Sequence, residues 1–485
     1  MSAPAHRVLV IGGGIAGLVC AYDLTRQGVS VTIVEADEVC GGALASRERA
    51  GLATDAGAEA FASQSSAVTE LIDDVGLSEQ LVTPNPAGAW LQLPELAAPL
   101  PATGLLGIPG DPEAEDVIAI LGASAAARAA EDSTADVECW RSRWEAVAAG
   151  RDRISLAELV ADRMGQAVVD RLVTPIVSGV HSAAAEALDV ESVAPGLVSL
   201  MLREGSLAQA VLARRAQAPA GSAVRSLRGG MHTLTLELIA RLRAGGAQIQ
   251  TGVAVKSLRD IPESYDDIIL AVDAPEVARL LGVDATAVTS SGAGESQQVE
   301  AGVGVALVTL MLDSEALDGS PRGTGMLVSP AVTEVAAKAM THVTSKWSWA
   351  AEALGPARHL VRLSYGRVDD DSHARPGAHS SDEELLDAAR ADVAALFGIP
   401  RLGEQVREAD VVRWRRAIPL SGPEHAGRAA QLRRRVRETS GPGGARLHAT
   451  GTWFAGTGLS KVVLDARQTA RDVLRNVELQ GGWRR

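Results

Sequence analysis

The sequence is poor in cysteine and aromatic residues, and it has no long apolar run. Its three cysteines, Cys20, Cys40 and Cys139, do not form a Cys-x-x-Cys pair or any other metal-binding spacing. A sparse, odd cysteine count excludes a disulfide framework and suits a reducing compartment. The longest apolar stretch beyond the N-terminal region, 301–312, is too short to cross a bilayer. We therefore expect a cytoplasmic protein without a metal site; peripheral membrane contact stays open.

Positive charge is also in short supply. The chain has 46 Lys and Arg against 60 Asp and Glu, a formal net charge of −14 at pH 7. A nucleic-acid-binding protein presents a basic stripe, so the composition excludes nucleic acid as the main partner. An acidic surface does not attract anionic substrates, and any such substrate would need local Arg or Lys side chains. At 485 residues the chain is too long for one simple core, which predicts two domains.

The clearest motif is a glycine-rich turn near the N-terminus. The apolar β-formers Val8–Ile11 predict a buried parallel strand, and glycines follow it at once. In Gly12-x-Gly14-x-x-Gly17 the first glycine permits a tight turn, the second admits a pyrophosphate, and the third lets the helix pack closely. A second predicted strand ends at Glu35, whose carboxylate can accept hydrogen bonds from ribose hydroxyls. The sequence therefore predicts a dinucleotide-binding βαβ unit, with phosphates at a helix N-terminus.

The remaining pattern predicts helices and strands along the whole chain. We expect helices at 68–75, 166–173, 234–242, 382–396 and 428–437, and a closing helix to about 474. Pro175 is expected to stop the second of these, since proline breaks a helix interior. Strands are expected at 248–250, 253–255, 266–272, 303–312 and 359–365. A polar linker is expected at 285–298, and a strand, glycine turn and helix at 447–459.

These elements predict an interleaved domain order. The nucleotide domain is expected in three pieces, 1–84, 221–284 and 445–485. A helical substrate subdomain is expected at 85–220, and an α+β substrate domain at 285–444. The expected fold class is therefore α/β, with a Rossmann-like domain split in three pieces around the substrate domain. A simple NAD dehydrogenase has one continuous cofactor block, so this order favours an FAD oxidase.

Two further segments resemble the flavin amine-oxidase-like superfamily. They are the second glycine pair, Gly41-Gly42, and the segment Asp55-Ala56-Gly57-Ala58-Glu59-Ala60-Phe61. In that superfamily both segments lie along FAD, and a domain that binds only NAD has no need of them. The resemblance implies FAD as the cofactor.

Within that superfamily the chain resembles the flavin-dependent porphyrinogen oxidases, and best the Gram-positive coproporphyrinogen III oxidase branch. The resemblance runs almost end to end and is carried, besides the glycine motifs, by segments 105–111, 170–181, 226–231, 346–347 and 414–419. It implies six-electron oxidation of a porphyrinogen to a porphyrin in haem synthesis, with molecular oxygen as the acceptor. Such chemistry needs placement against a cofactor more than an acid–base triad, and no catalytic residue is assigned.

The resemblance also implies which residues bind the ligands. The implied FAD contacts are Gly12, Gly13, Gly14, Ile15, Ala16, Gly17, Glu35, Ala36, Gly42, Ala43, Gly57, Ala58, Glu59, Ala60, Val255, Trp414, Thr452, Thr457, Gly458 and Leu459. The implied substrate contacts are His181 and Lys346.

The chain departs from the family pattern at several positions, so other functions stay open. Gln64 and Ser65 stand where the family commonly has basic residues, Ala43 replaces a basic residue after the glycine pair, and Ser460 replaces a proline. The alternatives are a protoporphyrinogen IX oxidase, another FAD oxidoreductase such as an amine oxidase or a carotenoid-type desaturase, and a binding protein without turnover. An amine oxidase would need an aromatic cage beside the flavin, and the chain has only three Tyr and three Phe.

Overall fold

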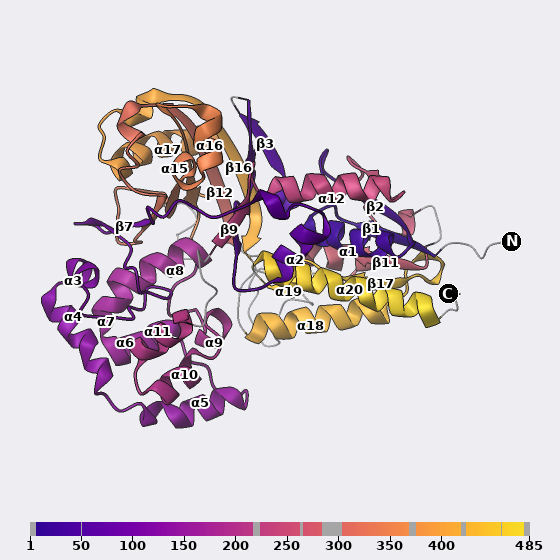
Figure 1. The fold of residues 1–485 in the computed structure, drawn as a ribbon. Helices are drawn as coiled ribbons and strands as arrows, with labels where there is room; N and C mark the ends of the chain where they lie inside the picture. The colour runs from indigo at the N-terminus through magenta and orange to yellow at the C-terminus, as the bar shows by residue number, and fades with distance from the viewer. Residues whose placement is uncertain are drawn as a thin grey trace. The chain divides into compact units, whose positions relative to one another are not determined.

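The chain divides into two units, each assembled from separate segments of the sequence. The computed structural model describes residues 6–49, 51–216, 224–261, 265–283, 303–367, 375–418, 423–456 and 458–479. Unit 1 comprises Met1–Thr83, Ser222–Ala301 and Pro419–Arg485, and unit 2 comprises Pro84–Gly221 and Gly302–Ile418 (Figure 1). Segment 419–444, which the sequence pattern placed in the substrate domain, is thus part of unit 1. The expected linker 285–298 lies outside the described residues.

Unit 1 is built on a five-stranded sheet in the order β10-β2-β1-β11-β17, with every neighbouring pair parallel. Its strands are β1 (Arg7–Ile11), β2 (Ser30–Val34), β10 (Gln248–Gln250), β11 (Asp267–Leu270) and β17 (Arg446–Ala449). The expected strand at 253–255 is wrong: after β10 the chain leaves the sheet, and these residues are irregular. Their side chains do not alternate with buried neighbours, because Val253 and Ala254 are both exposed.

Helices cover both faces of this sheet. Alternate residues of β1 enter different cores, since successive side chains of a strand point to opposite faces. Val8 and Val10 pack with α1 (Ile15–Arg26), α12 (His232–Ala244) and α20 (Leu459–Leu479). Leu9 and Ile11 pack with α13 (Ala274–Leu281) and α18 (Pro423–Glu438) on the other face. The remaining elements of unit 1 are β3 (Ser46–Arg49), β4 (Leu52–Asp55), β5 (Phe61–Ala62), α2 (Ala67–Asp74), β6 (Leu81–Val82), β9 (Val224–Leu227) and α19 (Thr452–Ala455).

Unit 2 contains a seven-stranded mixed sheet in the order β16-β12-β15-β14-β13-β7-β8. Its strands are β7 (Trp90–Gln92), β8 (Ala97–Pro99), β12 (Val303–Asp313), β13 (Gly325–Val328), β14 (Ala339–His342), β15 (Arg358–Tyr365) and β16 (Val406–Ile418). The apolar side of α17 (Asp382–Phe397) packs on alternate residues of β12. The short helices α15 (Val343–Lys346) and α16 (Ser348–Leu354) follow β14. No helix among the described residues combines the length and apolarity that a membrane crossing requires.

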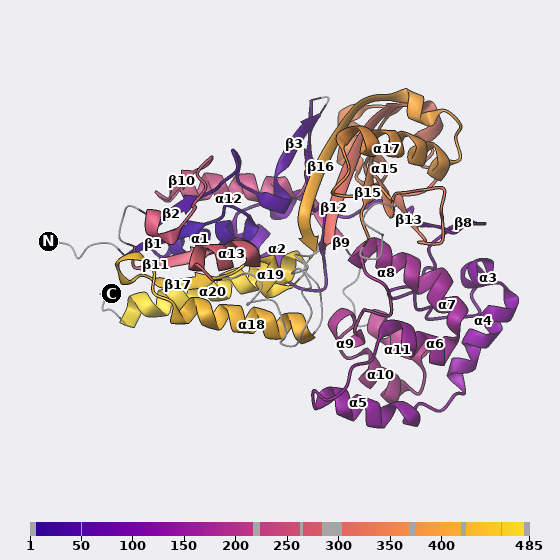
Figure 2. The same cartoon turned by 180° about the vertical axis from the view of Figure 1, so that it is seen from behind.

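The rest of unit 2 is helical (Figure 2). It contains α3 (Glu115–Leu121), α4 (Ala123–Ala130), α5 (Arg141–Ala148), α6 (Leu156–Met164), α7 (Gln166–Val168), α8 (Thr174–His181), α9 (Val190–Val193), α10 (Leu197–Glu204) and α11 (Leu207–Ala216). The expected stop at Pro175 is wrong, because this proline lies in the first turn of α8. A π-helical segment, Val169–Val173, precedes it. Its wider turn leaves room for the proline ring, so the helical path continues through the proline.

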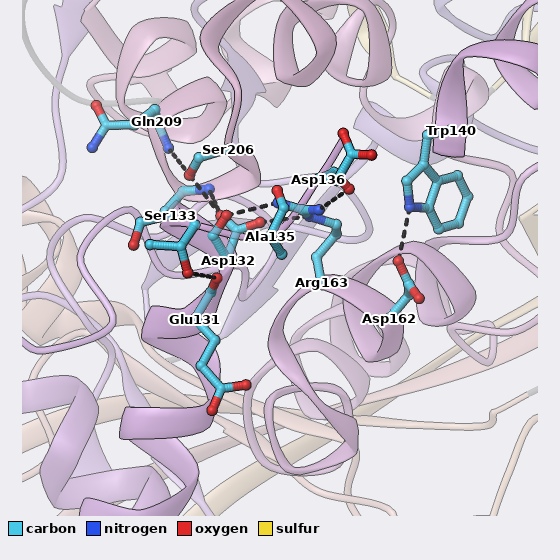
Figure 3. A network of polar contacts seen from close by, with 12 residues as sticks. Glu131, Asp132, Ser133, Ala135, Asp136, Trp140, Asp162, Arg163, Ser206 and Gln209 are labelled. Atoms are coloured by element: carbon cyan, nitrogen blue, oxygen red, sulfur yellow. Dashed lines mark hydrogen bonds and ion pairs between the residues drawn. The ribbon is translucent and has the colours of Figure 1, made fainter. Parts of the chain in front are cut away.

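A buried ion pair ties these helices together. Arg163 Nε donates to Asp132 Oδ1 at 2.6 Å, and both side chains are about 1% exposed (Figure 3). The other nitrogens of the guanidinium donate to the backbone carbonyls of Asp132, Ala135 and Asp136. The second carboxylate oxygen of Asp132 accepts from Ser206 Oγ and from the backbone N–H of Ala208. Because both charged groups are paired and each makes several hydrogen bonds, their burial is tolerated.

Candidate functional site

The predicted dinucleotide site of unit 1 lies along one edge of its sheet. The strand registers pair Ile11 with Val34 and with Leu270, Val34 with Gln250, and Leu270 with Ala449. All five parallel strands therefore end level with one another. The glycine turn follows β1 at this edge, and Glu35 and Ala36 follow β2. In open parallel sheets, ligands bind outside the carboxyl ends of the strands.

The glycines of the first turn have distinct roles. A Cβ atom at Gly17 would lie 2.0 Å from the carbonyl oxygen of Gly12, so only glycine lets α1 approach β1 this closely. A Cβ atom at Gly14 would meet nothing within 4 Å. The open space beside Gly14 is therefore not needed for packing, and it matches the approach of a pyrophosphate to the backbone.

The N-terminus of α1 offers backbone N–H groups to an anion. Gly14 is the N-cap residue of this 12-residue helix, no side chain caps it, and the first turn contains no acidic residue. The first N–H groups of a helix, here those of Ile15, Ala16 and Gly17, have no partner within the helix. Together with the positive end of the helix dipole they suit a phosphate.

Glu35 is bound to the same turn. Its Oε2 accepts the backbone N–H of Gly13 at 2.6 Å, and its Oε1 accepts the N–H of Asp37 at 2.9 Å. A carboxylate oxygen has lone pairs for more than one donor, so ribose hydroxyls can still bind there. The carboxylate also orders the turn that would hold the pyrophosphate, a role that the motif alone did not predict.

Cys40 lies against the same turn. A Cβ atom at Gly13 would meet Cys40 Sγ at 2.6 Å, so the thiol fills the space next to this glycine. Burial, with a smaller contribution from the Glu35 carboxylate, raises the pKa of the Cys40 thiol to about 11. The thiol therefore stays protonated near neutral pH and packs as a small apolar group.

The second glycine pair and the segment from Asp55 join this edge. Gly41 forms a β-bridge with Gly14, and a Cβ atom at Gly42 would lie 3.3 Å from Gly14 Cα. The carbonyl of Ala43 accepts the N–H of Ala58 at 2.9 Å, and Gly57 packs directly on Ala43. The structure thus brings together the predicted cofactor residues at Gly12–Gly17, Glu35–Ala36, Gly42–Ala43 and Gly57–Ala60.

Asp55 has a structural role that the sequence did not reveal. Its carboxylate accepts the backbone N–H groups of Met231 and His232, at 3.0 and 2.8 Å, where α12 begins. The ring Nδ1 of His232 lies 2.9 Å from Asp55 Oδ1. In addition, Ser226 Oγ donates to the carbonyl of Glu59 at 2.7 Å. The segments 55–61 and 226–231, which stood apart as motifs, therefore form one hydrogen-bonded structure.

The predicted contact at Val255 follows β10 rather than lying on a strand. Its carbonyl accepts from Arg279 Nη2 of α13 at 2.6 Å. Arg279 also donates to the carbonyl of Lys256 and pairs with Glu276. This arginine fixes the irregular segment after β10, and no sequence signal pointed to it.

The turn after β17 completes the edge. The hydroxyl of Thr450 donates to Asp465 Oδ2 at 2.7 Å, which ties the end of β17 to α20. Thr452 then opens α19, and Leu459 opens α20 after Gly458. Trp453 of α19 is held by α18, since His425 Nε2 donates to the Trp453 carbonyl at 2.8 Å and the two rings pack edge to face. Thr457 lies outside the described residues.

Three predicted site residues belong to unit 2. Trp414 lies on β16 and is half-buried. Lys346 ends α15, and its Nζ lies 5.3 Å from the ring centre of Trp347. Since β12 and β15 separate β16 from β14, after which α15 begins, the structure does not bring Trp414 and Lys346 together. His181 ends α8, and its side chain is outside the described part of the structure.

The described residues contain no group of three or more His, Cys, Asp or Glu side chains that could hold a metal ion. The groups at the sheet edge are instead backbone N–H donors of a glycine-rich turn and one carboxylate, Glu35, which accepts hydrogen bonds. These suit the pyrophosphate and ribose of a dinucleotide such as FAD.

Known proteins resemble this chain over nearly its whole length. Residues 15–474 match the family model of flavin-containing amine oxidoreductases. The coproporphyrinogen III oxidase of Mycobacterium tuberculosis is 30% identical, over 97% of this chain and 98% of its own length. That of Bacillus subtilis is 24% identical, over 98% and 99%. The crystal structure of an Exiguobacterium protein, provisionally assigned as a protoporphyrinogen oxidase, superposes with a TM-score of 0.79 at 23% identity, covering 98% of this chain and 100% of that one.

Proposed function

The chain belongs to the flavin-containing amine oxidoreductase family, and from that premise we propose that it oxidises coproporphyrinogen III to coproporphyrin III in haem synthesis. It is an FAD-dependent enzyme with the amine-oxidase-like fold. One observation carries the choice of substrate: a 30% identical relative, matched over nearly the full length of both chains, is named for this reaction. The position of the glycine turn, with Gly14 open to a pyrophosphate, supports FAD as the bound cofactor.

The reaction removes six hydrogen atoms from the macrocycle. When bound, FAD supplies the two-electron redox chemistry, and molecular oxygen takes the electrons away as hydrogen peroxide. Three such two-electron steps, with three oxygen molecules reduced to three of peroxide, balance the conversion. The protein's part is to hold the cofactor at the strand ends of unit 1 and to place the substrate against it.

The substrate's propionates need positive groups. In an acidic chain these must be local, and arginine and lysine differ in what they offer: a planar fork or a single ammonium. We propose Lys346 as a propionate contact, supported by its place beside Trp347 in a segment that resembles the family. We further propose that the end of α8 at His181 borders the substrate. We expect Lys346→Met to raise KM for coproporphyrinogen III with less effect on kcat.

The test is porphyrin fluorescence in air with the purified, FAD-loaded protein. Coproporphyrinogen III and protoporphyrinogen IX are compared side by side, each against an autoxidation blank without protein. Production of coproporphyrin above the blank, faster than that of protoporphyrin, is the expected result. Faster turnover of protoporphyrinogen IX would reassign the substrate. Absence of turnover with both, in a fully FAD-loaded sample, would refute the proposal and direct the assay to amines and polyenes.

A further inference from the structure

A pocket in unit 2 collects arginines on the side of the sheet that faces α17. Its volume is about 780 Å³, which is within the range of small-molecule sites. The charged side chains and the histidine that line it are Arg367, Arg375, His379, Asp382, Arg413 and Arg415. Four arginines against one carboxylate give this pocket a positive charge on a chain whose net charge is −14.

The pocket lies on the opposite face of β16 from Trp414. Arg413 pairs in register with Ala306, whose side chain lies in the core beneath α17. Its guanidinium donates to the Ser380 carbonyl and to Asp382 at the start of α17. Because adjacent residues of a strand point to opposite faces, Trp414 faces away from this pocket. The pocket is therefore separate from the predicted flavin contact.

The arginines of this pocket are anchored mainly by backbone carbonyls. Arg375 Nη2 donates to the carbonyls of Pro330 and Val332, at 3.2 and 3.3 Å. Arg367, which is 7% exposed, donates from Nη2 to the carbonyl of Val328 at 3.0 Å. A carbonyl orients a guanidinium but does not cancel its charge, so the contacts of Arg375 leave its positive charge in place. The charge of Arg367 is shared with Asp392: burial raises the pKa of the Asp392 carboxyl, and Arg367 partly opposes that rise.

Arg375 contributes a buried N–H donor that makes no hydrogen bond within the described structure. Arg375 Nη1 is buried and has no hydrogen-bond partner among the described residues. A buried donor without a partner costs free energy comparable to its lost hydration, and a bound acceptor would recover that cost. The exposed side chain of Arg415 lines the same pocket and can close on a ligand from the solvent side.

We propose that this pocket binds a small oxyanion with two or more negative charges, carried by phosphate or carboxylate groups. Its lining residues all belong to unit 2, and none of them is a residue predicted to bind flavin or substrate. Arg375 supplies the buried donor and Arg415 the solvent-side donor.

The experiment is calorimetric titration of the FAD-loaded protein, so that the dinucleotide site is already filled. Inorganic pyrophosphate and citrate are the two probes, and chloride at equal ionic strength is the charge control. We expect saturable 1:1 binding of at least one probe, weakened by added salt. Phosphate and carboxylate sources are distinguished by which of the two probes binds more tightly.

Arg415→Gln is the main variant, because the exposed residue can be replaced without disturbing the core. Loss of one charge-assisted hydrogen bond should weaken binding about tenfold. Arg407→Gln is the matched control: it lies on the same strand, is exposed, and pairs with Asp313 outside the pocket. Arg375→Lys, which keeps the charge but loses the fork, should weaken binding without a change of Tm that exceeds that of the control.

Three outcomes would overturn the proposal. One is no saturable binding of either probe at about 10 mM, since the affinity would then be weaker than about 3 kcal/mol. A second is an equal loss in the Arg415 and Arg407 variants, which would indicate general charge effects. The third involves the aspartates at 369–371, which follow Arg367 in the sequence outside the described residues. If replacing all three by Asn creates binding that the natural protein lacks, the chain's own carboxylates are the counter-charges.

Discussion

The carboxylate of Glu35 accepts the backbone N–H of Gly13 at 2.6 Å, so the end of β2 holds the turn after β1. A substitution of Glu35 should therefore weaken FAD binding more than the loss of a ribose contact alone would. Glu35→Gln removes the charge from both hydrogen bonds at once, and we expect FAD affinity to fall by about tenfold or more. Titration of the apo-protein with FAD, followed by quenching of flavin fluorescence, measures it. Glu38→Gln, an exposed neighbour, is the control and should bind FAD like the natural protein.

Alanine substitutions at Gly14 and Gly17 should have different effects, the first on FAD affinity and the second on the free energy of unfolding. A Cβ atom at Gly14 meets nothing, and its φ of −70° is one that alanine adopts freely. Gly14→Ala should therefore keep its unfolding free energy and lose FAD affinity, because the methyl group occupies the phosphate's space. Gly17→Ala would place a methyl 2.0 Å from a carbonyl oxygen, and we expect a loss of about 1–3 kcal/mol or more in stability. Urea unfolding of both apo-proteins, with FAD titration, checks the pair; equal destabilisation would contradict this reading.

Asp267 predicts a pH-dependent contribution to stability. Burial would raise its pKa, but hydrogen bonds from Arg446, His448 and His6 together outweigh burial and hold the pKa well below the usual range. A carboxyl group whose pKa is lowered by folding stabilises the folded state at pH values above its unfolded pKa of about 4. This contribution is lost as the pH falls from there towards the lower pKa of the folded state. Asp267→Asn should cost about 3–5 kcal/mol near pH 7, because it strands a half-buried arginine.

Urea unfolding of the natural protein and the Asp267→Asn variant between pH 3 and pH 8 measures this contribution. The difference in unfolding free energy should be steady above about pH 5 and shrink below about pH 4. A difference that grows on acidification would show that the sign is wrong.

His342 should make unit 2 sensitive to mild acid. Burial, with a smaller contribution from the charge of His359, lowers the pKa of His342 to about 3. Below the unfolded pKa of about 6.5 the unfolded chain binds a proton that the folded chain refuses, so stability falls as pH drops. His342→Phe keeps a ring beside Phe397 and removes the titration. Its Tm should change less between pH 7 and pH 4 than that of the natural protein; parallel pH profiles would contradict the prediction.

The nucleotide-binding half of the site was predictable because its rules are local. Backbone geometry dictates where glycine is required, so β1, the glycine turn and Glu35 could be placed from spacing. The contacts of Asp55 with α12 and of Arg279 with the segment after β10 join residues far apart in sequence. Nothing in composition or periodicity distinguishes such residues from ordinary surface charges.

The wrong predictions of secondary structure also have their cause in tertiary context. Pro175 was expected to end a helix, but the π-helical turn before it leaves room for the proline ring. Val253–Val255 has the composition of a strand, yet the chain leaves the sheet after β10 and tertiary contacts decide its path. Nothing in the sequence indicated that Asp132 and Arg163 form an ion pair, which the fold buries almost completely.

The order of the strands in unit 1 also has a consequence for synthesis on the ribosome. β1 lies between β2 and β11, and β11 stays an open edge until β17 is made. Both segments of unit 2 are translated before residue 419, so that unit can be complete while the final strand is still in the exit tunnel. A chain that stops before Arg446 would leave the apolar strand β11 with an unpaired edge. Such an edge is a template for aggregation. Nascent chains of this length should therefore depend on chaperones until the last strand docks and the cofactor edge closes.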